Sequence, residues 1–136
     1  MPNQQRPRVL LVDDYERMLE AWRRLLEPAC EIVGGVTNGE EALPLARSLK
    51  PDVIVVDLSM PGLSGFDVCR EIRQIAPGTR VVLVSADDNE ALRNAAEHFG
   101  AAAFVTKSEA ADELEDAIRR AVGPRSDSWL PAQGNG

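Results

Sequence analysis

Hydrophobic and polar positions along the chain follow two alternating patterns. Short runs of apolar, largely β-branched residues recur, and the longer stretches between them carry apolar residues at helical spacing. The short runs predict strands at residues 9–12, 31–36, 53–56, 80–84 and 103–105. Three of these runs are almost uninterrupted, which is typical of parallel strands covered by helices on both faces. The pattern therefore predicts alternating strands and helices around a buried parallel sheet.

The ends of the first two helices carry recognisable signals. Apolar residues over 18–26 share one helix face, and Pro28 ends that helix. Thr37 with Glu40 has the spacing of a capping box, which predicts that the second helix starts there. Pro44 then falls within the first turn or two of the second helix, where a proline is tolerated.

The remaining three helices have similar signals. Ser64 with Asp67 has the spacing of a second capping box, ahead of the third helix. An alanine-rich fourth helix is expected over about residues 89–99, and Gly100 is suited to end it in a left-handed conformation. The fifth helix is expected to begin after Ser108.

Five strands alternating with five helices imply right-handed crossovers and an α/β fold, a doubly wound three-layer sandwich with strand order 2-1-3-4-5. The domain is expected to span residues 8–122. Residues 1–7 are expected to be a disordered segment, and the Gly-, Pro- and Ser-rich residues 123–136 a flexible tail. Trp129 and Leu130 within that tail are expected to be unstructured.

Composition narrows the class of protein. With 136 residues, 44% hydrophobic and 27% charged, the chain fits one globular domain. Its net charge of −7 lacks the basic footprint of a nucleic-acid binder, so direct DNA binding by this chain is not expected. The absence of a long apolar run and of a signal-like start predicts a cytoplasmic protein that does not enter the membrane. Cys30 and Cys69 lack metal or redox spacing and are expected to be buried.

Polar side chains gather at the predicted strand ends. Asp13 and Asp14 follow the first strand, Asp57 the third, Ser85 the fourth and Lys107 the fifth. In the order 2-1-3-4-5 these four strands are neighbours, so the five side chains are expected to converge at the carboxyl edge of the sheet. Each has an ordinary explanation on its own, as a helix cap, a turn residue or an exposed lysine. Their joint placement is what predicts a site.

Three carboxylates held close together repel one another, which raises pKa values unless a cation is present. Oxygen ligands of this kind favour Mg²⁺, which is usually held by one or two carboxylates together with phosphate oxygens. Aspartate is also a covalent acceptor of phosphoryl groups, and phosphoryl transfer depends on positioning and charge neutralisation. The residues therefore predict Mg²⁺-dependent phosphoryl transfer, with Lys107 supplying further positive charge.

Four motifs carry a resemblance to a known family. They are VLLVDD at residues 9–14, VIVVDLSMPGLSG at 53–65, VVLVSA at 81–86 and GAAAFVTKS at 100–108. With them the chain resembles a response-regulator receiver domain of two-component signalling, of the CheY-like superfamily. The residues of these motifs are most similar to those in receivers of LuxR/NarL-type regulators, which carry a helix-turn-helix output domain.

The resemblance implies a role for each acidic residue. Asp57 corresponds to the phospho-accepting aspartate. Asp13 and Asp14 correspond to the acidic pair that holds Mg²⁺, with Asp13 acting directly or through a water. Asp57 itself and the main-chain carbonyl of Ser59 are expected to complete the protein ligands.

The resemblance also implies a switch. Ser85 is similar to the hydroxyl that turns toward the phosphoryl group, Lys107 to the lysine that pairs with it, and Phe104 to the aromatic switch residue, for which core packing is an equal alternative. Ser108 replaces a proline common in the family and is expected to cap the last helix instead. Asp87, like Ser59, occupies a position that tunes phosphoryl lifetime in the family.

The resemblance implies a phosphorylation-controlled switch rather than a turnover enzyme. The phosphoryl group would come from a sensor histidine kinase, a histidine phosphotransfer protein or a small phosphodonor such as acetyl phosphate. The face around the fourth helix, fifth strand and fifth helix would then control a downstream protein, and a homodimer could form on phosphorylation. Three alternatives remain: a receiver fragment of a LuxR-type DNA-binding regulator, a phosphorylation-independent pseudo-receiver, and a small phosphohydrolase of the haloacid-dehalogenase type.

Overall fold

The computed structural model describes residues 6–123, and in that range five strands alternate with five helices. The strands are β1 Arg8–Val12, β2 Glu31–Val36, β3 Val53–Asp57, β4 Arg80–Ser85 and β5 Ala103–Thr106. The helices are α1 Glu16–Leu26, α2 Gly39–Leu49, α3 Gly65–Ile75, α4 Glu90–His98 and α5 Ala110–Val122. All neighbouring strands are parallel, in the order β2-β1-β3-β4-β5. This confirms the predicted doubly wound fold.

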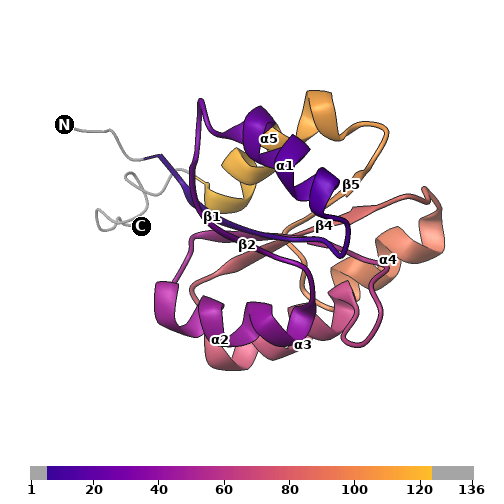
Figure 1. The fold of residues 1–136 in the computed structure, drawn as a ribbon. Coiled ribbons are helices and arrows are strands. Elements are labelled where there is room, and N and C mark those ends of the chain that lie inside the picture. Colours follow the sequence, from indigo (N-terminus) through magenta and orange to yellow (C-terminus); the bar gives the residue numbers. More distant parts are fainter. Residues whose placement is uncertain (1–5, 124–136) are drawn as a thin grey trace, which may run out of the picture.

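Helices cover both faces of the sheet (Figure 1), with α1 and α5 on one side and α2, α3 and α4 on the other. Because successive strand residues point to opposite faces, the central strands feed two separate apolar clusters. Leu10 and Ile54 pack on the α2, α3 and α4 side, whereas Val9 and Val53 pack on the α1 and α5 side. Burial on both faces explains why these strands appear in the sequence as continuous apolar runs.

Several local signals give the structures they predict. Ser64 and Asp67 form a complete capping box at the start of α3. Helix α1 ends before Pro28, and Gly100 follows α4 with a φ of 88°, in the left-handed region that glycine adopts without strain. Pro44 lies inside α2, in its second turn.

Two predicted caps are wrong. Asn38, not Thr37, caps α2: its side-chain oxygen accepts a hydrogen bond of 2.7 Å from the backbone N–H of Glu41. Asparagine caps as well as threonine does, so the spacing alone chose the wrong neighbour. Ser108 does not cap α5, whose N-cap is Glu109 without a side-chain cap bond, because the Ser108 hydroxyl lies 3.2 Å from the hydroxyl of Thr106.

The two cysteines, Cys30 and Cys69, are free and buried, as predicted. Burial raises the pKa of their thiols to about 11 and about 12 respectively. No helix within residues 6–123 has the length and apolar character needed to cross a membrane. The two terminal segments expected from the sequence fall almost entirely outside the described residues, and so do Trp129 and Leu130.

Candidate functional site

The carboxyl ends of four strands bring the sequence-predicted site residues to one edge of the sheet. Asp13 directly follows β1 and Lys107 directly follows β5. Asp57 and Ser85 are the last residues of β3 and β4, one position further into the sheet than the sequence predicted. That difference places both side chains in the buried layer, where Asp57 is 3% exposed and Ser85 is 2% exposed.

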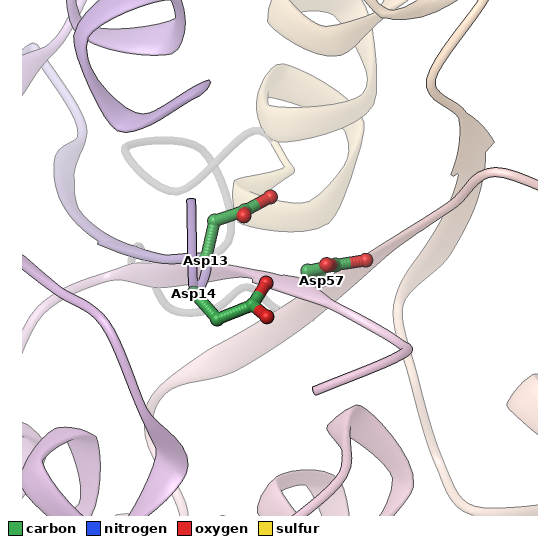
Figure 2. Close-up of side chains that lie close together, drawn as sticks. All are labelled: Asp13, Asp14 and Asp57. Atoms are coloured by element: carbon green, nitrogen blue, oxygen red, sulfur yellow. The ribbon is translucent and has the colours of Figure 1, made fainter. Parts of the chain in front are cut away.

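The three carboxylates meet above the sheet edge. One oxygen from each of Asp13, Asp14 and Asp57 can be chosen so that all three lie within 4.8 Å of one another. Figure 2 shows the three side chains grouped together, on segments that are separate in the chain. Asp13 is fully buried and Asp14 is exposed, so the cluster opens to solvent on the Asp14 side.

Lys107 supplies the positive charge within this cluster. Its Nζ lies 3.4 Å from Asp57 Oδ2 and 3.4 Å from Asp13 Oδ2, and only the approach to Asp57 has hydrogen-bond geometry. Desolvation lowers the pKa of Lys107, but the charges of Asp57 and Asp13 outweigh it, and the pKa is raised above its ordinary value. The ammonium is therefore firmly held in its charged form between two carboxylates.

Both buried carboxyl groups have a raised pKa. Desolvation is the main cause for Asp13 and for Asp57, and the Lys107 charge opposes it in both. Repulsion between carboxylates also raises the pKa values but is the smaller effect. The sequence predicted the direction correctly and the main cause wrongly, because repulsion follows from residue types whereas burial depends on the packed fold.

The donor set fits a divalent cation. Asp13 Oδ1 accepts a hydrogen bond of 2.8 Å from the backbone N–H of Tyr15, whereas Asp13 Oδ2 is buried and receives no hydrogen bond. The Lys107 ammonium, 3.4 Å away, is shared with Asp57 and makes no hydrogen bond to this oxygen, so a second cation would lower the cost of its burial. Oxygen ligands beside open solvent suit Mg²⁺, which keeps several of its waters. Asp13, Asp14 and Asp57 are therefore well suited to hold this ion.

Ser85 lies at the same end of the sheet, directly after Val84, which pairs with Asp57 in the register of β3 and β4. Its hydroxyl oxygen accepts a hydrogen bond of 3.0 Å from the backbone N–H of Asp87, and its carbonyl accepts one of 2.7 Å from the backbone N–H of Lys107. Ser85 thus connects the loop after β4 to the residue that carries the ammonium. The exposed Ser59 donates its backbone N–H to Asp57 Oδ1 over 3.4 Å.

Phe104 is set back from this cluster, two residues before the end of β5. It is half-buried, and the guanidinium carbon of Arg93 lies 5.0 Å from the centre of its ring. Arg93 also donates a hydrogen bond of 2.9 Å to Asp88. The ring is therefore covered by a cation on α4 that is tied to the loop after β4, a contact that sequence reasoning did not predict.

Thr106 is a second residue that sequence reasoning missed. It is 3% exposed, it pairs with Ser85 in the register of β4 and β5, and it immediately precedes Lys107. A hydroxyl at the end of an apolar strand was the available signal.

The comparison with protein families settles the class of domain. A family model described as the response regulator receiver domain matches residues 9–119. The chain belongs to this family. Receiver domains are signalling domains and not turnover enzymes, which argues against the phosphohydrolase alternative.

Curated relatives of this receiver domain include regulators of several kinds. The response regulator GacA of Pseudomonas aeruginosa is 34% identical over 115 residues, which are 83% of this chain and 54% of GacA. The nitrate/nitrite response regulator protein NarL of Escherichia coli is 32% identical over 124 residues, 90% of this chain and 57% of NarL. The chemotaxis protein CheY of Thermotoga maritima is 32% identical over 114 residues, 83% of this chain and 95% of CheY.

Solved structures agree with this assignment. A two-component response regulator of the LuxR family from Aurantimonas sp. SI85-9A1 superposes with a TM-score of 0.82 at 34% identity, over 87% of this chain and 86% of that one. The response regulator domain of Thermotoga maritima CheB gives 0.79 at 34% identity, over 87% and 97%. The resemblance to LuxR/NarL-type receivers is thereby confirmed. The chain spans about half the length of GacA and NarL.

Proposed function

We propose that this receiver domain accepts a phosphoryl group on a carboxylate oxygen of Asp57. The donor is a phosphohistidine on a sensor histidine kinase or histidine phosphotransfer protein, or a small phosphodonor such as acetyl phosphate. The observation that carries the proposal is the buried Asp57 carboxylate with two further carboxylates within 4.8 Å and the Lys107 ammonium 3.4 Å away. This arrangement combines a nucleophile, a cation site and a fixed positive charge.

The reaction forms one bond and breaks one. An oxygen of Asp57 attacks phosphorus, and the bond from phosphorus to the donor's nitrogen or oxygen breaks, with the electron pair leaving on the donor. Asp13, Asp14 and Asp57 would hold Mg²⁺, together with the main-chain carbonyl of Ser59. When bound, the ion would neutralise the charge of the phosphoryl oxygens. Lys107 pairs with one of those oxygens, at the cost of part of its contact with the carboxylates.

Phosphorylation then becomes a conformational signal through Ser85 and Lys107. Both side chains turn toward the new phosphoryl oxygens, which pulls on the loop after β4 and on the end of β5. Because Arg93 ties that loop to the Phe104 ring, the change reaches the face formed by α4, β5 and α5. This face, in its altered conformation, controls a downstream protein or pairs with a second phosphorylated copy.

Intact-mass analysis with acetyl phosphate tests the acceptor and the ion together. The unmodified chain should gain one phosphoryl group only when Mg²⁺ is present, and Asp57→Asn should gain none. Asp52→Asn is the matched control, because Asp52 precedes β3 at the opposite end of the same strand. It should be labelled at the normal rate, whereas labelling of Asp57→Asn would place the acceptor elsewhere.

Further measurements separate the alternatives. An unlabelled chain that Mg²⁺ does not stabilise would indicate a pseudo-receiver. Continued release of phosphate from a phosphate ester would favour a phosphohydrolase. The relatives favour a second candidate function, that of the receiver of a longer transcriptional regulator, because one match is the transcriptional regulatory protein DegU of Brevibacillus brevis, of which this chain covers 50%. The mass of the intact gene product distinguishes that candidate from a stand-alone receiver.

A further inference from the structure

The turn after β5 is held by two side-chain contacts that both start at Thr106 and span Lys107. The hydroxyl of Thr106 donates to Glu109 Oε1 over 2.9 Å, and it lies 3.2 Å from the hydroxyl of Ser108. Backbone bonds follow the same path, with the N–H of Glu109 donating to the carbonyl of Thr106 over 3.0 Å. Lys107 is therefore enclosed between two residues that are joined to each other.

The number of available protons decides which hydroxyl is the donor in each of these contacts. A threonine hydroxyl has one proton, and here that proton goes to the Glu109 carboxylate. The contact between Thr106 and Ser108 then needs the Ser108 hydroxyl as its donor. Because Thr106 is 3% exposed, water cannot readily replace either partner.

The backbone of Lys107 is fixed by the same elements. Its N–H donates to the carbonyl of Ser85 over 2.7 Å, and its carbonyl accepts from the N–H of Ala110 over 3.4 Å. The side chain beyond is a flexible four-carbon stem, so the direction in which it leaves the backbone decides where the ammonium lies. A small rotation of this turn would move Nζ away from the two oxygens that it approaches at 3.4 Å.

We propose that Thr106 and Glu109 are positioning residues for Lys107. Their mutual hydrogen bond fixes the turn that directs the Lys107 ammonium to Asp57 and Asp13, and so speeds phosphoryl transfer to Asp57. The inference rests on the proposed function, since it assigns these residues to the same reaction. Neither residue touches the acceptor, and both act through the lysine. In this chain Ser108 follows that lysine, where many receivers have a proline.

The first test is the rate of labelling by acetyl phosphate with saturating Mg²⁺. Thr106→Val removes the hydroxyl and keeps the shape, and should slow labelling about five- to tenfold, because small misplacements of a catalytic charge are costly. Thr106→Ser restores the hydroxyl and should remain within about twofold of the unmodified chain. Glu109→Ala should match Thr106→Val, whereas Glu109→Gln, whose amide oxygen still accepts, should lose less.

A purely structural role would give the same first result, so the second test removes Lys107. In a Lys107→Ala background, Thr106→Val should slow labelling no further. The same pair of substitutions is measured by urea midpoints, where Thr106→Val should lower the midpoint less once Lys107 is absent. This second measurement keeps the test decisive if Lys107→Ala labels too slowly.

Thr79→Val is the matched control. Thr79 is also a buried threonine, 8% exposed, whose hydroxyl donates to the carbonyl of Pro51 over 2.7 Å at the far edge of the sheet. It should lower stability and leave the labelling rate unchanged. Wild-type labelling by Thr106→Val, or equal slowing with and without Lys107, would overturn the inference. Labelling of Asp57→Asn would overturn the proposed function instead, so the two failures can be distinguished.

Discussion

The two edges of the sheet, at the carboxyl ends and at the amino ends of its strands, differ in how their buried polar groups are hydrogen-bonded. Among residues 6–123, four buried polar or charged residues lie at the carboxyl edge, namely Asp13, Asp57, Ser85 and Thr106, and one, Thr79, lies at the amino edge. At the amino edge the Thr79 hydroxyl has a short partner in a carbonyl. At the carboxyl edge Asp13 Oδ2 has no hydrogen bond, the only buried side-chain oxygen in that state within residues 6–123.

The amino edge therefore contributes to stability, whereas the carboxyl edge is arranged for function. The amino edge satisfies its polar groups within the chain: the backbone N–H of Arg8, for example, donates to Asp52 Oδ2 over 2.9 Å. The carboxyl edge concentrates negative charge beyond what Lys107 can neutralise, and both Asp13 and Asp57 have a raised pKa. A site that gives up stability in the absence of its ligands is prepared to gain free energy when a cation and a phosphoryl group bind.

Binding of Mg²⁺ at the carboxyl edge should change the free energy of unfolding more than any substitution at either edge. At a concentration about 100-fold above its dissociation constant, a ligand specific to the folded state raises the free energy of unfolding by about 2.7 kcal/mol. Asp13→Asn should lose most of that gain, because it removes a charged ligand, and Asp52→Asn should keep it. Urea unfolding with and without MgCl₂ measures both, and an equal gain in all three chains would contradict the cation site.

Thr79→Val, at the amino edge, should lower the free energy of unfolding. The Pro51 carbonyl would lose its partner in a buried position, which costs about 1–2 kcal/mol of unfolding free energy. Chemical denaturation measures the loss. Mg²⁺ should stabilise this variant by as much as it stabilises the unmodified chain, and a smaller effect of the ion would show that the two edges are coupled.

Asp57→Asn, at the carboxyl edge, should raise the free energy of unfolding, whereas Thr79→Val lowers it. Without Mg²⁺, replacing a desolvated carboxylate by a neutral amide of the same shape should raise the free energy of unfolding by about 1 kcal/mol. Lys107 keeps Asp13 as a partner in this variant. Denaturation in the presence of EDTA measures the gain, and a clear loss would mean that the ion pair outweighs desolvation.

The gain from Asp57→Asn should depend on pH in a defined direction. The folded-state pKa of Asp57 lies above its ordinary value of 3.8, so between those two pH values the folded state holds more protons than the unfolded state. The free energy of unfolding contributed by Asp57 therefore falls as pH rises through this window. The advantage of Asp57→Asn should vanish below pH 3.8 and reach its full size above the folded pKa. Urea midpoints of both chains across this range measure the effect.

Much of the fold could be predicted from the sequence, because its determinants are local. Continuous apolar runs predicted the parallel strands, and Ser64 with Asp67 predicted the start of α3. The same reasoning failed at α2, where Thr37 and Asn38 are adjacent and both can cap. It failed again at Ser108, because that hydroxyl contacts Thr106, a competing partner that only the folded turn brings close.

The residues of the candidate site were likewise visible as polar positions at the ends of apolar strands. Their types and order along the chain are enough to indicate a cation site and a nucleophile, and the motifs around them resemble those of a receiver domain. Packing decided the rest: that Asp13 and Asp57 are buried while Asp14 is exposed, that Lys107 reaches both buried carboxylates, and that Arg93 covers Phe104. Residue types and spacing set which groups are available, whereas desolvation and distance depend on segments far apart in the chain, and these two quantities determine the charge balance of the site.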